Sequence, residues 1–428
     1  MFTLLTSATA LLALSSALSG AQARCVPKKN IDLTPSQGSG NSSSKFIAKG
    51  YYTGWNSDDF PPENVSWSKY THMTYAFAMP TDNGTLTLEG SDPKGLEPFV
   101  KAAHENDVKV SISVGGWTGS RFISNLVATP ENRTAFVETL TDFAVQYKLD
   151  GLDIDWEYPN RQGLGCNTIS PNDTANFVLL LQELRAHPAA ANLSLSAAVS
   201  LAVFNDATGN PATNITGLGE VLDHLVIMNY DVWGSWSSSV GPNAPLNDTC
   251  AAPANQQGSA VWSMQKWNQA GVPLNKIVLG VAAYAHSFSV NTTDAFVNGS
   301  TTELAAYPPF NKGVHPVGDK WDDPEGAVDL CGVTNHAGGI YTFWGLIEAG
   351  FLKEDGSPNK PYRFDNCSRT AYAYDAEKEV MVSFDDPQAF ADKGSFITSS
   401  GLGGFSVWHA GGDKGTILLD AIRGGAGL

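Results

Sequence analysis

Four carboxylic acids lie within one short segment, from Asp150 to Glu157 (DGLDIDWE). Asp153, Asp155 and Glu157 are spaced by two residues, so on an extended strand their side chains point the same way, about 6.6 Å apart. The apolar residues between them point to the opposite side. Buried carboxyl groups at this spacing raise one another's pKa, which can keep one of them protonated near neutral pH. The pattern therefore predicts acid–base chemistry, with Glu157 as the acid.

Two other interpretations of this segment fit its residues less well. A solvated acidic loop would not alternate with Leu, Ile and Trp. A calcium site would need the glycine-containing loop and ligand-rich turn of an EF-hand, which the segment lacks. The cysteines show no CxxC or Cys/His spacing typical of metal sites, so we expect neither a metal nor a cofactor.

The elements that must position these acids are predicted from short apolar and β-branched runs. There are eight such runs: Lys45–Tyr52, His72–Ala78, Val108–Val114, Leu149–Glu157, Leu193–Val199, His224–Tyr230, Lys276–Ala282 and Gly403–Trp408. Amphipathic segments such as Thr134–Tyr147 and Ala175–His187 lie between them. Alternating strands and helices predict an α/β fold, a (β/α)8 TIM barrel. The acids would then face the barrel axis, with Glu157 nearest the catalytic rim.

The spacing of the runs is irregular at one place. About 120 residues separate the seventh run from the eighth, which is enough for an inserted subdomain. We place an α+β insertion at residues 287–385, within a catalytic barrel of residues 45–428. Its own strands are expected at Ala371–Tyr374 and Glu379–Phe384. Because it would leave from the carboxyl ends of the barrel strands, it should form a wall of the cleft.

Residues 1–23 contain an apolar stretch followed by a small-residue cleavage site, which predicts a secretory signal peptide. A flexible Ser/Gly/Asn-rich lead follows at residues 24–44. No later apolar run reaches the ~18 residues of a membrane span, so a secreted, extracellular protein is expected. Eleven Asn-x-Ser/Thr acceptors support an exported glycoprotein: Asn41, Asn64, Asn83, Asn132, Asn172, Asn192, Asn214, Asn247, Asn291, Asn298 and Asn366.

The five cysteines suggest disulfide bonds in an oxidising compartment. We expect Cys331 to pair with Cys367 and Cys166 with Cys250, which leaves Cys25 unpaired near the start of the chain. Spacing alone does not fix this connectivity.

The charge balance restricts the partners. Asp and Glu number 43 against 26 Lys and Arg, a formal net charge of -17, which would repel a phosphate backbone and argues against nucleic acid. The 11 Trp and 13 Tyr offer surfaces on which a neutral ligand with apolar faces can stack. A monomer is the expected state.

The acidic segment and its Tyr-Pro continuation, DGLDIDWEYP, resemble the DxxDxDxE signature of glycoside hydrolase family 18, the chitinases and their relatives. Three further segments are similar to strands of that family: KVSISVGGW from Lys109, MNYD from Met228 and GFSVW from Gly404. The resemblance spans residues 46–421. With the long insertion, it points to the bacterial-type subgroup that is common among fungal chitinases.

The resemblance implies a substrate-assisted mechanism in which the acetamido oxygen of the sugar is the nucleophile. It makes Glu157 the proton donor and later the base that activates water. Asp155 would hold the acetamido N–H and share a proton with Asp153. Tyr230 would hydrogen-bond the acetamido carbonyl, and the anomeric configuration should be retained.

The resemblance also implies a set of substrate-binding residues. Trp408 would form the floor under the reacting sugar, and Trp117 and Trp236 would be platforms on the leaving-group side. Further pocket residues are expected at Tyr51, Phe77, Ser113, Gly116, Met228, Asp231 and Tyr284. One departure is His286, which stands where many relatives carry Arg. We expect it to be a packed, structural histidine.

The sequence is compatible with three functions. The first is a secreted chitinase that cleaves β-1,4 linkages between N-acetylglucosamine units of chitin or chitooligosaccharides. The second is an endo-β-N-acetylglucosaminidase that acts on the chitobiose core of N-glycans. The third is a chitin-binding lectin without catalysis, although replacement of the terminal Glu is its usual signature and Glu157 is present here.

Overall fold

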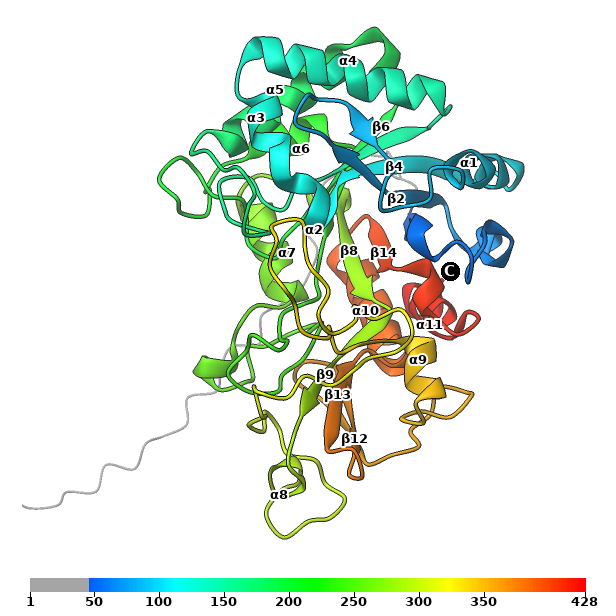
Figure 1. The fold of residues 1–428 in the computed structure, drawn as a ribbon, viewed down its shortest axis with the longest axis vertical. Helices are drawn as coiled ribbons and strands as arrows, with labels where there is room; N and C mark the ends of the chain where they lie inside the picture. The colour runs from blue at the N-terminus through cyan, green and yellow to red at the C-terminus, as the bar shows by residue number, and fades with distance from the viewer. Residues whose placement is uncertain (1–45) are drawn as a thin grey trace, which may run out of the picture. The chain divides into compact units, whose positions relative to one another are not determined.

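The computed structural model describes residues 46–428 (Figure 1). The predicted signal peptide, the lead at residues 24–44, Cys25 and Asn41 lie outside the described residues and stay predictions.

Eight parallel strands close into a barrel in the order β1-β14-β8-β7-β6-β5-β4-β2, with β2 pairing back to β1. Their bounds are β1 (Ile47–Thr53), β2 (His72–Pro80), β4 (Lys109–Gly115), β5 (Gly151–Asp155), β6 (Ser194–Val199), β7 (His224–Ile227), β8 (Ile277–Ala282) and β14 (Gly404–Trp408). A two-residue strand, β3 (Leu86–Thr87), pairs with the end of β2. Each predicted run coincides with one barrel strand, so the (β/α)8 barrel is confirmed. The fourth and sixth runs extend past their strands, so Glu157 and Tyr230 lie just beyond the strand ends.

Helices connect and surround the strands. They are α1 (Leu96–Glu105), α2 (Gly116–Gly119), α3 (Ile123–Val127), α4 (Pro130–Gln146), α5 (Asp173–Ala186), α6 (Thr216–Val221), α7 (Ala260–Gln269), α10 (Pro387–Ser400) and α11 (Ile417–Ala426). The two predicted amphipathic segments correspond to α4 and α5. None of the helices between residues 46 and 428 is both long and apolar enough to cross a membrane.

Local sequence sets the helix ends. The Thr129 side chain accepts a hydrogen bond from the Asn132 N–H at the start of α4, and Pro130 occupies the first turn. Helix α10 begins in the same way, with Asp386 as the cap before Pro387. It ends at Gly401, whose φ of 71° favours glycine.

A second sheet is formed by the segment that connects barrel strands β8 and β14 in the sequence, and it lies below the barrel in Figure 1. It is antiparallel, in the order β10-β9-β13-β12-β11. Its strands are β9 (Tyr284–Ser289), β10 (Ile340–Thr342), β11 (Tyr362–Asp365), β12 (Thr370–Asp375) and β13 (Val380–Phe384), with short helices α8 (Thr292–Ala295) and α9 (Phe343–Glu348). The predicted strands at 371–374 and 379–384 correspond to β12 and β13. The sheet starts at Tyr284, before the predicted boundary of the insertion.

The predicted disulfide pairing is wrong. The structure joins Cys166 to Cys331 and Cys250 to Cys367, with Cα atoms 5.5 and 5.7 Å apart. The long loop before β10 reaches back to the loop after β5, which brings Cys331 to Cys166. The loop after β7 lies against the turn between β11 and β12, which brings Cys250 to Cys367. These proximities come from the tertiary fold, so spacing along the chain could not reveal them.

Candidate active site

Side chains of β5 alternate between the two faces of the barrel wall, as the sequence predicts. Leu152, Ile154 and Trp156 belong to the main apolar core, and Trp156 packs edge-on against Phe177 of α5 at 5.7 Å. Asp153 and Asp155 point inside the barrel and are buried. The carboxylates therefore rise along the barrel axis toward Glu157 at its carboxyl end.

Asp153 is surrounded by hydrogen-bond donors. Its Oδ1 accepts from the Lys49 ammonium at 2.8 Å and from the Ser196 hydroxyl. Its Oδ2 accepts from the hydroxyls of Tyr51 and Ser113, both at 3.0 Å. Burial alone would raise the pKa of Asp153, but the charge of Lys49 and the hydrogen bonds from Lys49 and Ser196 lower it below its usual value. These contacts favour an ionised Asp153 over the proton shared with Asp155 that the resemblance implies.

Asp155 and Glu157 have the opposite electrostatics. Burial, followed by the negative charges of Glu157 and Asp153, raises the pKa of Asp155 well above its usual range. The Oδ1 atom of Asp155 has no hydrogen-bond partner among the described residues. Burial and the nearby charge of Asp231 raise the pKa of Glu157 to about 7. Glu157 can therefore carry a proton at neutral pH and give it to a substrate.

The backbone around Glu157 is held firmly. Its N–H donates to the Ser120 hydroxyl at 2.9 Å, and its carbonyl accepts from the Asn167 amide at 3.0 Å. The same Ser120 hydroxyl donates to the Asp155 carbonyl at 3.2 Å. A fixed backbone limits the positions that the acid can take, which favours catalysis on a bound substrate.

A cavity of about 360 Å³ opens above these carboxylates. It brings together nine of the predicted site residues: Tyr51, Phe77, Trp117, Asp155, Glu157, Met228, Tyr230, Asp231 and Trp408. It is also lined by Tyr158, Ala198, Ser200 and Leu201, which the sequence did not single out. Burial and the surrounding acids raise the pKa of Tyr230 well above its usual value, so its phenol stays a donor.

The other predicted residues lie around this cavity. Asp153 and Ser113 lie beneath it in the barrel. At Gly116, whose φ is 78°, an added Cβ would come within 2.9 Å of the Phe77 ring, so glycine permits the close approach. The Tyr284 hydroxyl donates to Asp231, which lines the cavity. The Trp236 ring packs against His286 next to this contact.

Aromatic rings form the floor and one side of the cavity. Trp408 stacks on Phe77 with ring centroids 5.7 Å apart and contacts Tyr51 edge-on at 5.4 Å. Trp55, in the turn after β1, stacks on Phe77 with ring centroids 5.9 Å apart, lies 6.4 Å from the Trp408 ring and is 46% exposed. Trp55 was missed, although an aromatic residue directly after a barrel strand is a usable signal. Trp117 and Trp236 are 49% and 61% exposed, so their rings are available for stacking on a ligand.

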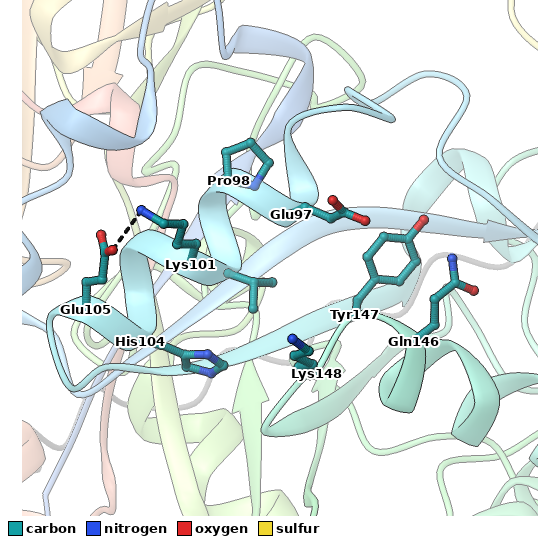
Figure 2. Close-up of a pocket in the computed structure, with 9 residues that line it drawn as sticks. Glu97, Pro98, Lys101, His104, Glu105, Gln146, Tyr147 and Lys148 are labelled. Atoms are coloured by element: carbon teal, nitrogen blue, oxygen red, sulfur yellow. Dashed lines mark ion pairs between the residues drawn. The ribbon is translucent and has the colours of Figure 1, made fainter.

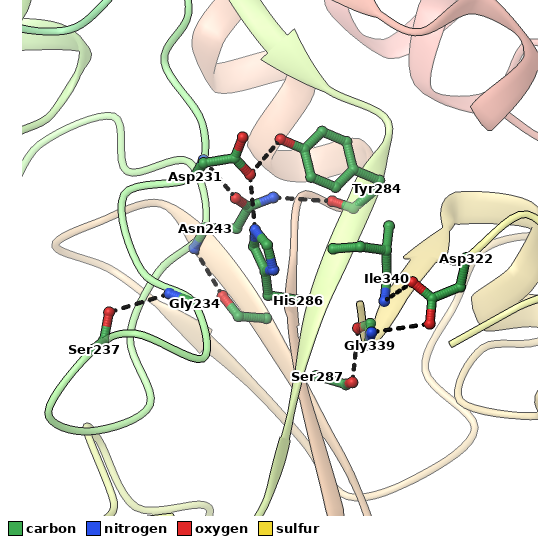
Figure 3. Close-up of polar contacts among 11 residues, drawn as sticks. Asp231, Gly234, Ser237, Asn243, Tyr284, His286, Ser287, Asp322, Gly339 and Ile340 are labelled. Atoms are coloured by element: carbon green, nitrogen blue, oxygen red, sulfur yellow. Dashed lines mark hydrogen bonds and ion pairs between the residues drawn. The ribbon is translucent and has the colours of Figure 1, made fainter. Parts of the chain in front are cut away.

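Asp231 is the centre of a polar network at the edge of the cavity (Figure 3). Its Oδ1 accepts from the Tyr284 hydroxyl at 2.6 Å and lies 2.7 Å from His286 Nε2. The backbone N–H of Asp231 donates to Asn243, whose amide donates to the Tyr284 carbonyl. His286 is buried and its ring lies 5.3 Å from that of Trp236, edge to face. His286 therefore packs between Asp231 and Trp236, in keeping with the structural role expected for it.

A larger cavity of about 810 Å³ lies elsewhere, between α1 and the segment that follows α4 (Figure 2). Its lining carries charges of both signs, and Lys101 pairs with Glu105 at 2.7 Å. It contains none of the inward-facing carboxylates of β5. Within residues 46–428, no group of three or more His, Cys, Asp and Glu side chains could hold a metal ion. The acid–base chemistry therefore belongs to the smaller cavity.

Comparison with known proteins gives consistent matches. The sequence model described as "Glycosyl hydrolases family 18" matches residues 48–413. A "chitinase-like effector" of Moniliophthora perniciosa is 64% identical over the whole of both chains. The crystal structure of a chitinase from Rhizomucor miehei superposes with a TM-score of 0.80 at 32% identity, over 89% of this chain and 100% of that one. A Group IV chitinase of Ostrinia furnacalis, crystallised with allosamidin, has a TM-score of 0.72 at 25% identity, over 90% of this chain and 99% of that one.

Proposed function

The chain belongs to family 18 of the glycosyl hydrolases, and from this we propose that it is a secreted chitinase that cleaves β-1,4 linkages between N-acetylglucosamine units. One observation carries the proposal above all. A carboxyl group that can be protonated at neutral pH, Glu157, lies in an aromatic-lined cavity with Asp155, Tyr230 and Trp408.

The arrangement supports a retaining, substrate-assisted reaction. The sugar's acetamido oxygen attacks the anomeric carbon while Glu157 gives its proton to the departing glycosidic oxygen. The C–O bond breaks and an oxazolinium ion forms on the substrate. The Glu157 carboxylate then takes a proton from water, which attacks the same carbon from the face that the leaving group vacated. The product keeps its anomeric configuration.

The remaining groups would hold the nucleophile in place. Asp155, with an unpartnered buried oxygen, would accept from the acetamido N–H. Tyr230 would donate to the acetamido oxygen, and the Trp408 ring would lie under the apolar face of the sugar. Restricting the acetamido group in this way removes much of the entropic cost of the attack.

Two features support export of the protein. Disulfide bonds persist in oxidising compartments, and the structure has two. The Asn-x-Ser/Thr acceptors between residues 46 and 428 all keep solvent-exposed surface, and only Asn247 among them is half-buried. Both features fit a glycoprotein that leaves the cell.

A second candidate is a protein that binds chitooligosaccharides without cleaving them. The observation in its favour is the name of the Moniliophthora perniciosa relative, "chitinase-like effector". In this candidate, the aromatic residues and Asp231 would bind the sugar, and the carboxylates would have no catalytic role.

The test compares chitohexaose with a high-mannose N-glycan at pH 5 to 7, with chromatography of the products and calorimetry of binding. Cleavage of chitohexaose but not of the N-glycan supports the chitinase. Binding of chitohexaose without cleavage supports the second candidate, and cleavage of the N-glycan alone contradicts both.

A further inference from the structure

We propose that Lys49 is a positioning residue that holds Asp153 as an anion with its acceptor positions filled, which confines the acidic proton of the cluster to Asp155 and Glu157. The proposal rests on the proposed function and specifies how the protons of that site are distributed.

Lys49 has an unusual place for a lysine. It lies on β1, and its side chain points into the barrel, where it is 1% exposed. Its neighbours in register are His72 on β2 and Ser406 on β14. Burying an ammonium group is strongly unfavourable unless a counter-charge is present. Asp153, 0% exposed and 2.8 Å away on β5, provides that charge.

The carboxylate of Asp153 has no room for another donor. A carboxylate offers about four lone-pair positions. Lys49 and Ser196 donate to Oδ1, and Tyr51 and Ser113 donate to Oδ2. A proton on Asp155 therefore finds no vacant acceptor on Asp153, and Glu157 is the remaining carboxyl group in the cluster.

Other titratable groups face the same space. His224 on β7 is buried beside Lys49, and burial together with the Lys49 charge holds its pKa well below the usual value, so the ring stays neutral. His72 on β2 lies 6.0 Å from His224, ring centroid to ring centroid. Tyr51 on β1 has its pKa raised well above the usual value by burial and by Asp153, so it stays a neutral donor. The facing residues of β4, β6 and β14 are serines, and Lys49 is the cation that lies 2.8 Å from the Asp153 carboxylate.

Removing the ammonium group should change the protonation of Asp153. In Lys49→Met, the buried carboxylate has lost its counter-charge and takes up a proton as the pH falls. Its new O–H can donate to the unpartnered Oδ1 of Asp155. Asp155 would then be held toward the barrel floor, away from the acetamido group and from Glu157.

The test is a pH profile of kcat and KM for chitotetraose cleavage by the wild type and Lys49→Met. The control is Lys393→Met, because Lys393 pairs with Asp385, both are 0% exposed, and neither lines the cavity. We expect kcat of Lys49→Met to fall about tenfold or more at pH 5, because loss of the ammonium group should shift the protonation equilibrium of Asp153 by about one pKa unit or more. KM should change much less. The loss should shrink toward pH 8, where Asp153 of the variant ionises, and Lys393→Met should keep the wild-type profile shape.

A loss of kcat that is the same at every pH would overturn the proposal, because a merely structural role for Lys49 predicts that result. If Lys49→Met does not fold, a second measurement tests the proposal. The aspartate carboxyl groups of the wild type are labelled with carbon-13 and their titration is followed by NMR. An Asp153 resonance that stays at its ionised position down to about pH 4, with Asp155 protonated throughout, supports the proposal. One titration step shared by the two resonances overturns it. This measurement needs no substrate, so an inactive wild type would contradict the proposed function without deciding the role of Lys49.

Discussion

Replacing Glu157, the proposed catalytic acid, should stabilise the protein, and the gain should depend on pH. Burial and the Asp231 charge raise the pKa of Glu157 from 4.5 to about 7. Below about pH 4.5 the carboxyl group is protonated in both the folded and the unfolded protein. Between pH 4.5 and about 7 the unfolded chain ionises while the folded protein does not, so the wild type loses stability as the pH rises.

Glu157→Gln removes this loss because an amide does not ionise. The difference between 4.5 and about 7 corresponds to about 3 kcal/mol, fully present above pH 7 and absent below pH 4.5. Part of the Glu157 surface remains in contact with solvent, so this value is an upper bound.

Thermal unfolding of the wild type and Glu157→Gln at pH 4.5 and pH 8 measures the effect. We expect a clearly higher Tm for the variant at pH 8 and similar Tm values at pH 4.5. The control is Glu220→Gln, which changes an exposed glutamate on α6 and should not reproduce this pattern. A gain of Glu157→Gln that is equal at both pH values would refute the electrostatic reasoning.

Three further predictions concern the cavity. In Asp231→Asn, loss of a negative charge lowers the pKa of Glu157, so the alkaline limb of the kcat/KM profile should move to lower pH; an unmoved limb contradicts this. Tyr230→Phe removes the proposed donor to the acetamido oxygen and should lower kcat by about 100-fold, as loss of one transition-state donor does, with little change in KM. Steady-state kinetics on chitotetraose that find a higher KM and an unchanged kcat would contradict this role. Trp55→Ala should weaken binding of chitohexaose by about 0.5 to 1.5 kcal/mol, with a smaller effect on chitobiose. Calorimetry that finds equal effects on the two sugars would exclude Trp55 from an extended subsite.

Much of the candidate site could be predicted from the sequence because the patterns that indicate it are local. The two-residue spacing of Asp153, Asp155 and Glu157 sets a common direction on a strand. β5 holds Asp153 and Asp155 in this way, and Glu157 follows just after the strand end. Tyr230 and Trp408 are the last residues of two predicted apolar runs. In a barrel, the carboxyl ends of the strands meet at one rim, so both residues are expected there.

Features that depend on contacts across the barrel could not be predicted in this way. Lys49 stands in an alternating run in which nothing reveals that its partner is Asp153, 104 residues later. The disulfide partners are brought together by the long loop before β10 and by the loop after β7, whose paths no spacing encodes. The ionised state of Asp153 follows from its four donors on three other strands, so the number of acids in the segment did not predict it.

In the proposed reaction, Glu157 protonates the glycosidic oxygen while the acetamido group of the substrate attacks. The most direct test is a time course of chitotetraose cleavage followed by proton NMR, with anomers resolved, for the wild type and Glu157→Gln. We expect the wild type to release β-anomers first, which then equilibrate, and Glu157→Gln to bind the tetramer but to lose several orders of magnitude in rate. Initial α-anomers from the wild type, or a Glu157→Gln variant that cleaves at a similar rate, would contradict it.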